Sequence, residues 1–220
     1  MADNCRSPEK AARRVFRRYF PLIFILWILF VLYPNPVKLI VSIQRVLNFD
    51  ADPRAVEFML NDFPSDPVEI EKAIVAGIPY HRDWELYGMP WYCPTIEQIL
   101  ERKGGDCKAR ALVLASVLEA KNISYQVRSS PMHIWVDYEH KQENSFENPQ
   151  VEFYEYNPET GERRLQVPTI SQSDLMDSLR QQFWTPMPDD RRALLIGGSL
   201  TLIAARIILR KRKAVQLAAW

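Results

Sequence analysis

The chain of 220 residues is poor in cysteine: it has only Cys5, Cys93 and Cys107, and no two of them are spaced as Cys-x-x-Cys. Three cysteines are too few for a scaffold built on disulfides, and their spacing gives no zinc motif. The sequence also has no acidic cluster typical of a calcium site. We therefore expect no metal and no cofactor.

Acidic side chains are absent from residues 191–220, which carry seven basic ones, while residues 1–37 carry six basic and two acidic side chains. The middle of the chain, residues 38–190, has 15 basic and 25 acidic residues, a balance of −10. Phosphate binding needs lysine and arginine on the working face, so this acidic body argues against nucleic acid as a partner. Apolar residues make up 47% of the chain, which excludes disorder throughout.

The most apolar stretch runs from residue 19 to residue 37 and has 19 residues without a charge. At ~1.5 Å per residue, a helix of that length nearly crosses a hydrocarbon core of roughly 30 Å. Pro34 and Pro36 would end such a helix. We predict a transmembrane helix. A cleaved signal peptide is the alternative, but no A-x-A-like cleavage site follows the stretch.

A second apolar stretch, residues 193–209, is weaker because Gly197 and Gly198 lower its helix propensity and because it contains Arg206. In a membrane, this arginine would have to extend towards the basic residues that follow it. We favour a second transmembrane helix over an amphipathic surface helix or a helix of the soluble domain.

Basic residues flank both stretches, five of them within residues 10–18 and four within residues 210–213. Basic residues beside membrane segments tend to stay in the cytoplasm. We therefore predict cytoplasmic tails at residues 1–18 and 210–220, with the domain of residues 38–190 on the other side of the membrane.

The segment between the two stretches shows helical patterns first and strand patterns afterwards, which defines the α+β class. The predicted elements are two short helices within 53–76 separated by Pro64 and Pro67, an aromatic loop over 78–93, helices over 95–102 and 107–121, strands over 124–129, 132–138 and 151–156, a polar loop over 139–150, and a short helix near 174–183. Thr95 and Gln98 have the spacing of a capping box.

Two residues of this segment point to chemistry. Cys107 begins a helix directly after a Gly-Gly turn, where backbone N–H groups and the helix dipole favour a thiolate and could bind an oxyanion. His133 opens a later strand and could serve as the base. Taken singly, a cysteine in a helix or a histidine on a strand is usually structural, and the order of the two carries the hypothesis.

A third group has to orient the imidazole. Asn157 follows the strand over 151–156 and is the candidate that we favour, provided that this strand neighbours the one that His133 opens. Asp137 lies four residues along the same strand as His133, about 13 Å away, and is therefore less suitable.

The stretch PTIEQILERKGGDCKARALVLASVLEAKNISYQVR, followed by HIWVDY and YNPETG, resembles the transglutaminase-like superfamily of papain-type cysteine enzymes. That family has a Gly-x-Cys helix start, a His-x-Trp-Val strand and an Asp-Pro-Thr turn. The resemblance covers residues 94–161. It implies a transglutaminase-like, papain-like domain in a prokaryotic membrane-anchored protein, with a Cys-bearing helix packed on an antiparallel sheet.

By position, the resemblance implies that Cys107 is the nucleophile, that His133 is the general base and that Asn157 replaces the usual aspartate. It also implies an oxyanion donor from the aromatic loop, for which Trp91 and Tyr92 are candidates. The expected activity is that of a cysteine peptidase or amidase on a protein or cell-envelope peptide, or of an acyltransferase that passes the acyl group to an amine.

Three alternatives stay open. The domain could be a catalytically silent, membrane-tethered module that grips a peptide with the loop over 78–93. A disulfide between Cys93 and Cys107 would block the nucleophile. Lys108 and Arg110 could favour the thiolate or hold an acidic group of the substrate, or they could lie on a solvated helix face.

Overall fold

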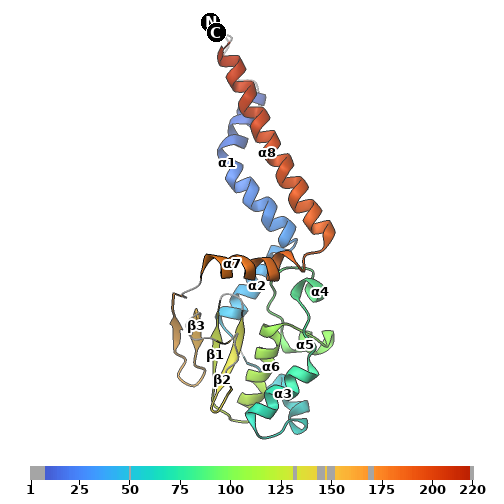
Figure 1. Ribbon diagram of the computed structural model, residues 1–220, viewed down its shortest axis with the longest axis vertical. Helices are drawn as coiled ribbons and strands as arrows, with labels where there is room; N and C mark the ends of the chain where they lie inside the picture. The colour runs from blue at the N-terminus through green and yellow to red at the C-terminus, as the bar shows by residue number, and fades with distance from the viewer. Residues whose placement is uncertain are drawn as a thin grey trace. The chain divides into compact units, whose positions relative to one another are not determined.

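The computed structural model describes residues 8–49, 51–130, 133–142, 147, 152–167 and 171–218. The chain divides into two compact units (Figure 1). One contains residues 1–36 and 187–220, and the other contains residues 37–186.

The first unit is a pair of long helices, α1 (Pro8–Leu32) and α8 (Asp189–Ala218). Their contacts have an antiparallel register, because Trp27 lies against Gly198 while the Arg206 guanidinium lies 4.2 Å from the centroid of the Phe20 ring. A Cβ atom at Gly198 would collide with the Trp27 ring, so a glycine is what allows the two helices to approach closely here. Arg206 therefore packs over an aromatic face of the other helix.

Each of these helices contains a segment that is long and apolar enough to cross a membrane, Val15–Leu32 and Asp189–Leu209. Few side chains of either segment are buried, so both present apolar surface outward. Exposed apolar surface of this extent is typical of contact with lipid or with another protein. The prediction of two membrane-capable helices is thus confirmed at the level of length and composition.

The end of the first apolar helix differs from the prediction, which carried it to residue 37. Helix α1 ends at Leu32, ahead of Pro34, and Pro36 starts a separate helix, α2 (Pro36–Leu47). Proline is accepted in the first turn of a helix, where its missing N–H has no partner to lose. Pro36 thus begins a second helix, while Pro34 lies just after the end of the first.

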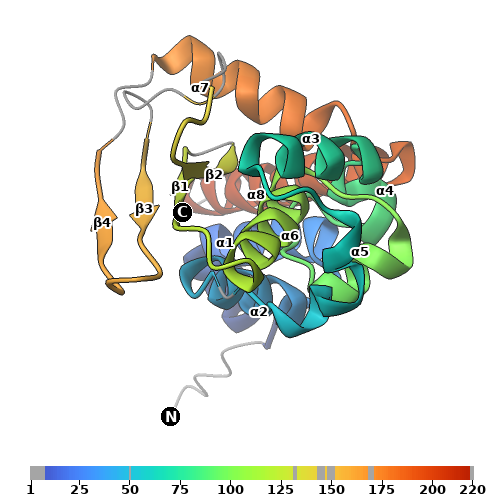
Figure 2. The same cartoon turned by 90° about the horizontal axis from the view of Figure 1, so that it is seen from below.

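The second unit contains a four-stranded antiparallel sheet in the order β2-β1-β3-β4 (Figure 2). Its strands are β1 (Tyr125–Ser129), β2 (Ile134–Tyr138), β3 (Tyr154–Tyr156) and β4 (Arg163–Leu165). The first three confirm predicted strands at shorter bounds, and predicted positions 132 and 151 lie outside the described residues. Strand β4 was missed because its three residues are all exposed and therefore show no alternation.

The helices of this unit largely follow the predicted order. Besides α2, which was not predicted as a separate helix, they are η1 (Arg54–Asp62, a 3₁₀ helix), α3 (Pro67–Gly77), α4 (Asp83–Tyr87), α5 (Ile96–Arg102), α6 (Cys107–Ala120), α7 (Gln172–Leu179) and η3 (Arg180–Trp184, a π-helix). The capping box at the start of α5 is confirmed: the Gln98 N–H donates to the Thr95 hydroxyl, and the Thr95 N–H donates to the Gln98 side chain. Only α4 falls inside the segment that was predicted to be a loop.

Helix α6 lies at the centre of the core and packs against α3, η1, β1 and β2. Nearly every side chain from Lys108 to Leu118 is buried, so the helix is covered on all sides and not along a single stripe. Because interiors are packed as densely as organic crystals, a helix enclosed in this way has little freedom to shift.

Two backbone hydrogen bonds hold the turn that precedes α6 against residues 79–81. The Gly105 N–H donates to the Pro79 carbonyl at 3.1 Å, and the His81 N–H donates to the Gly105 carbonyl at 3.1 Å. A Cβ atom at Gly105 would collide with the Cβ of Ala109, one turn into the helix. The second glycine of the Gly-Gly turn is therefore required by packing against the helix that it introduces.

We predict that Gly105→Ala lowers the free energy of unfolding by about 1–3 kcal/mol, because the added methyl group has no space beside Ala109. Gly77→Ala is the matched control, since a Cβ there meets no atom within 4 Å. Thermal unfolding of the full chain in detergent micelles measures both variants. Equal stability of the two variants would contradict the packing argument.

Candidate functional site

Cys107 is the first residue of α6, and Asp106 is the N-cap of that helix. The Asp106 carboxylate accepts from the N–H groups of Lys108 at 3.0 Å and Ala109 at 3.4 Å. This cap leaves the N–H of Cys107 itself unengaged by Asp106. The Cys107 side chain is half-buried and faces a cavity of about 290 Å³.

His133 lines the same cavity from the end of the hairpin that joins β1 to β2. Ser130 fixes that end, because its N–H donates to the His133 carbonyl at 2.8 Å while its hydroxyl accepts from the His133 N–H at 3.1 Å. The imidazole stacks on the Trp135 ring with centroids 5.7 Å apart and planes 14° apart. Backbone and ring contacts together orient the imidazole.

The imidazole of His133 lies between Cys107 and Glu147. Its Nε2 is 3.8 Å from Glu147 Oε1, the spacing of an ion pair. Burial alone would lower the pKa of His133, but the neighbouring Cys107 and Glu147 outweigh it and raise the pKa to about 9. The imidazole is therefore protonated at neutral pH, between two groups that can carry negative charge.

Glu147 occupies the place for which the sequence suggested Asn157. Its side chain is buried, with 6% of its surface exposed. Burial alone would raise the pKa of this carboxyl, but the contacts with His133 and Lys141 hold it below its usual value. Cysteine, histidine and carboxylate thus follow one another in space in the order of a nucleophile, a base and an orienting group.

The rest of the cavity wall is mixed in character. Tyr80, which is 46% exposed, stands at the cavity, and the Arg110 guanidinium lies 5.4 Å from the centroid of its ring. Apolar side chains of α3, α6 and β2 form most of the remainder, namely Ile74, Val75, Ala111, Leu114, Ile134 and Val136. A largely apolar cavity with a few polar groups is the usual form of a small ligand site.

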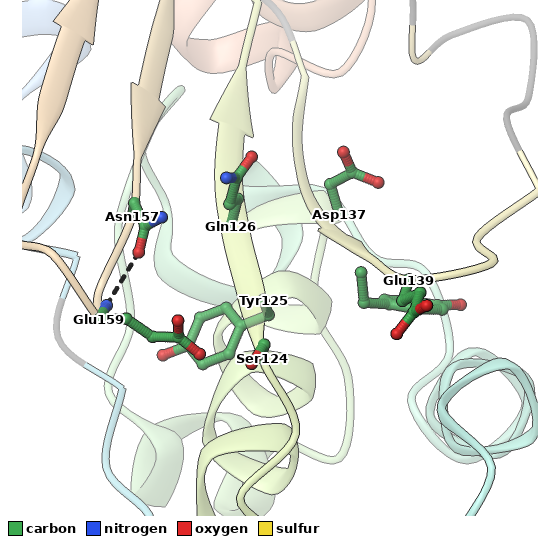
Figure 3. A pocket seen from close by; sticks show the side chains of 8 residues that line it. Ser124, Tyr125, Gln126, Asp137, Glu139, Asn157 and Glu159 are labelled. Carbon is green, nitrogen blue, oxygen red and sulfur yellow. Dashed lines mark hydrogen bonds between the residues drawn. The ribbon is translucent and has the colours of Figure 1, made fainter.

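Asn157 is not beside His133. Strand β3, which it follows, pairs with β1, so that β1 separates it from β2. Figure 3 shows Asn157 in a different pocket, with Gln126 of β1 between it and Asp137 of β2. Two strand spacings of about 4.8 Å and several residues along the strands separate Asn157 from His133, which places them well over 10 Å apart.

Both side chains that the sequence offered as the third group have other roles. Asn157 Oδ1 accepts from the N–H groups of Glu159 at 2.9 Å and Thr160 at 3.3 Å, so the side chain closes the turn after β3. Asp137 lies 3.2 Å from the Arg128 guanidinium. The structure brings neither of them to the cavity.

The two candidate oxyanion donors, Trp91 and Tyr92, do not line the cavity. Tyr92 is buried, its hydroxyl lies 3.2 Å from Gln98 Oε1, and its N–H donates to Asp83 at 2.8 Å. Trp91 has the Lys108 ammonium 6.0 Å from its ring centroid. Trp91 thus lies beside the start of α6, whereas the Tyr92 side chain packs beside α5 and α2.

Lys108 and Arg110 have structural partners. Lys108 is buried, pairs with Asp106, and lies 2.8 Å from Asp83 Oδ2, so it is not on a solvated helix face. Arg110 donates to the Ile78 carbonyl at 2.8 and 3.0 Å and to the Val75 carbonyl at 3.4 Å, at the end of α3. These contacts attach α4 and α3 to α6.

Cys93 and Cys107 are both free thiols, so no disulfide blocks the site. Cys93 is buried, and burial raises its pKa to about 11. Within the part of the chain that the structure describes, no three His, Cys, Asp or Glu side chains are grouped to hold a metal ion.

Sequence reasoning missed Glu147, Lys141 and Tyr80 as residues of the site. The polar loop over 139–150 contains three glutamates, and no periodicity distinguishes the one that reaches the imidazole. Tyr80 was noted only as part of an aromatic loop. Its place follows from the pairing of Pro79 and His81 with Gly105, a contact between segments 24 or more residues apart in the chain.

The chain is an α+β protein with a four-stranded antiparallel sheet and two helices that could span a membrane. Comparison with protein-family models, with curated proteins and with solved structures finds no match.

We predict that Glu147→Gln lowers the pKa of His133 from about 9 towards the ordinary value of ~6.5, because the neutral amide no longer stabilises the imidazolium. Asn157→Ala is the control and leaves that pKa unchanged. Proton NMR of the histidine ring signals as a function of pH measures it. A shift caused by Asn157→Ala and not by Glu147→Gln would assign the third role back to the asparagine.

Proposed function

We propose that the chain is a membrane-anchored cysteine enzyme of the transglutaminase-like type, which forms an acyl-enzyme at Cys107. The observation that carries this proposal is the juxtaposition of Cys107, His133 and Glu147 at one cavity, with the imidazole held protonated beside the thiol. A protonated imidazole next to a cysteine favours the thiolate, which is the nucleophilic form.

In the first half-reaction, the Cys107 thiolate attacks the carbonyl carbon of an amide bond. The carbonyl oxygen becomes an oxyanion, and the C–N bond then breaks as the His133 imidazolium gives its proton to the leaving amine. The products are a free amine and a thioester on Cys107. Glu147 keeps the imidazole in place throughout, as the third member of a triad does.

In the second half-reaction, the neutral imidazole of His133 takes a proton from the attacking group. Water as that group releases a carboxylic acid, and an amine as that group gives a new amide. Both routes restore the thiolate–imidazolium pair. Access of water or amine to the thioester decides between them, and we propose hydrolysis of a peptide or amide bond as the main outcome.

The start of α6 offers the oxyanion donor that the aromatic loop does not. Asp106 takes the N–H groups of Lys108 and Ala109, and the N–H of Cys107 is the remaining one of that first turn. A backbone N–H at a helix N-terminus is a suitable donor to a developing negative charge. We assign this role to Cys107 N in place of Trp91 and Tyr92.

The cavity wall favours a peptide with an apolar side chain next to the bond that is attacked. Ile74, Val75, Ala111 and Leu114 provide the apolar surface, and Tyr80 stands at the cavity with nearly half of its surface open to solvent. Burial of one apolar side chain contributes roughly 1.5–3 kcal/mol to binding.

Alkylation by iodoacetamide tests the nucleophile in the full chain in detergent micelles. At pH 6 we expect Cys107 to react roughly 10- to 100-fold faster in the native chain than in a His133→Gln variant, because a glutamine side chain cannot form an ion pair with the sulfur. Peptide mapping separates Cys107 from the buried Cys93. Cys107→Ser should abolish both the fast labelling and the release of amine from peptide amides.

The alternative of a silent binding module predicts a different result. Labelling of Cys107 would then rise only near the ordinary thiol pKa of ~8.5, at the same rate with or without His133, while peptides still bind. That outcome would end the catalytic proposal.

We also propose that α1 and α8 cross the membrane, with both termini in the cytoplasm and residues 37–186 outside it. The support is the length, hydropathy and outward exposure of Val15–Leu32 and Asp189–Leu209, together with basic residues before the first and after the second.

A cysteine introduced in the exposed turn after β3 tests this topology. In bacterial spheroplasts that express the full chain with its three native cysteines replaced by serine, we expect Thr160→Cys to react with a membrane-impermeant maleimide before permeabilisation, because the proposed topology puts that exposed turn outside the cytoplasm. Ser7→Cys in the N-terminal tail is the control and should react only afterwards. Labelling of Thr160→Cys only after permeabilisation would place the domain in the cytoplasm.

A further inference from the structure

The lysine that follows β2 is buried, although it comes directly after a turn. His140 adopts a left-handed conformation with φ of 65°, and the Lys141 N–H donates to the Tyr138 carbonyl at 3.1 Å. This turn brings the Lys141 side chain back alongside β2, where only 4% of it is exposed. Burial of an ammonium group is costly unless each of its donors has a partner.

The ammonium of Lys141 has three partners for its three N–H donors. It donates to the Val136 carbonyl at 2.7 Å, it lies 3.2 Å from Glu147 Oε1, and it lies 3.1 Å from Glu71 Oε1. Its charge therefore bridges two carboxylates, one beside the imidazole and one on α3. The first partner, a backbone carbonyl in the middle of β2, fixes the position of the bridge relative to the sheet.

Glu71 is itself held in place. The Tyr138 hydroxyl donates to Glu71 Oε2, and Glu71 lies on α3, which packs against α6. The chain of contacts thus runs from α3 through Lys141 to Glu147, and from there to His133, which lines the same cavity as Cys107. Every link in it joins side chains of the described residues.

We propose that Lys141 is a positioning residue of this site, which holds the Glu147 carboxylate ionised and pointed at the His133 imidazole. The inference rests on the proposed function, because it assigns Glu147 the orienting role. Lys141 does not touch the reacting atoms and acts through Glu147.

The alternative is that Lys141 only neutralises nearby negative charge, and the two roles have opposite effects on His133. If Glu147 stayed in place without Lys141, removal of a positive charge would make the imidazole harder to deprotonate. If Glu147 depends on Lys141, its removal leaves two carboxylates close together, so that Glu147 protonates or turns away and the imidazole loses its partner. The direction of the change in His133 therefore distinguishes them.

The other charged or titratable groups around the His133–Glu147 pair come from several elements. They are Cys107 and Arg110 of α6, Glu71 of α3, Tyr138 of β2 and Tyr80. None of them is altered in Lys141→Met, so a change in His133 reports on Lys141 and Glu147.

The test is the titration of His133 in the full chain in detergent micelles, with histidine labelled with ¹³C in the ring. The chain has three histidines, and the signals are assigned with His81→Gln and His140→Gln. In Lys141→Met we expect the His133 pKa to fall from about 9 towards ~6.5, as far as in Glu147→Gln. The double variant Lys141→Met/Glu147→Gln should show no further fall, because both changes remove the same interaction.

Three further variants serve as controls. Lys141→Arg keeps the charge and should retain most of the native titration. Lys72→Met removes an exposed lysine of α3 that contacts Glu69, and it should leave His133 unchanged. If Lys141→Met does not fold, Lys141→Met/Glu71→Gln keeps the net charge of the site. The same fall is expected, because Glu147 still loses the ammonium that holds it in place and can turn away from His133.

An unchanged or raised His133 pKa in a folded Lys141→Met or Lys141→Met/Glu71→Gln chain would overturn the positioning role. This readout needs no substrate and no turnover. A silent Cys107 together with a lowered His133 pKa would therefore refute the proposed function alone, and fast alkylation of Cys107 with an unaltered His133 would refute the role of Lys141 alone.

Discussion

A lysine held between two carboxylates at the start of α6 sets the position of the candidate site. Lys108 pairs with Asp106 and Asp83, Asp106 also caps the helix, and Asp83 accepts from the Tyr92 N–H. Because an unpaired buried charge costs several kcal/mol, these groups have to assemble together. Burial leaves the pKa of Asp83 raised to about 7 even with the ammonium beside it. The position of Cys107 follows from this cluster, since it lies between the cap and the lysine.

The parts of the structure that the sequence predicted are those with local causes. The capping box at Thr95, the Gly-Gly turn before Cys107 and the apolar content of α1 and α8 each depend on residues within a few positions of one another. Such patterns predict structure correctly because the interactions behind them join residues that are close in the sequence. The strands were found by the same kind of local pattern, where they were long enough to show one.

The third member of the site could not be predicted, because its place depends on the order of strands and on a loop. Asn157 was chosen on the assumption that its strand neighbours β2, but β1 lies between them. Glu147 comes from a segment without periodicity, and it lies beside both His133 and Lys141. The spacing of residues in the sequence predicts neither the strand order nor the position of Glu147, since both arise from contacts between elements that are distant in the sequence.

The hydrogen bonds that join Pro79 and His81 to Gly105 couple the shape of the cavity wall at Tyr80 to the position of the start of α6. If these segments were separate loops, each could change without the other. Tyr80, which stands at the cavity, belongs to the same short bridge that ends one residue before the cap of α6. A longer or differently shaped loop there would displace the start of α6 along with the cavity wall. Substitution of single side chains on α3 and α6 should therefore change the shape of the cavity without moving α6. Insertions in the segment around Tyr80 should be poorly tolerated.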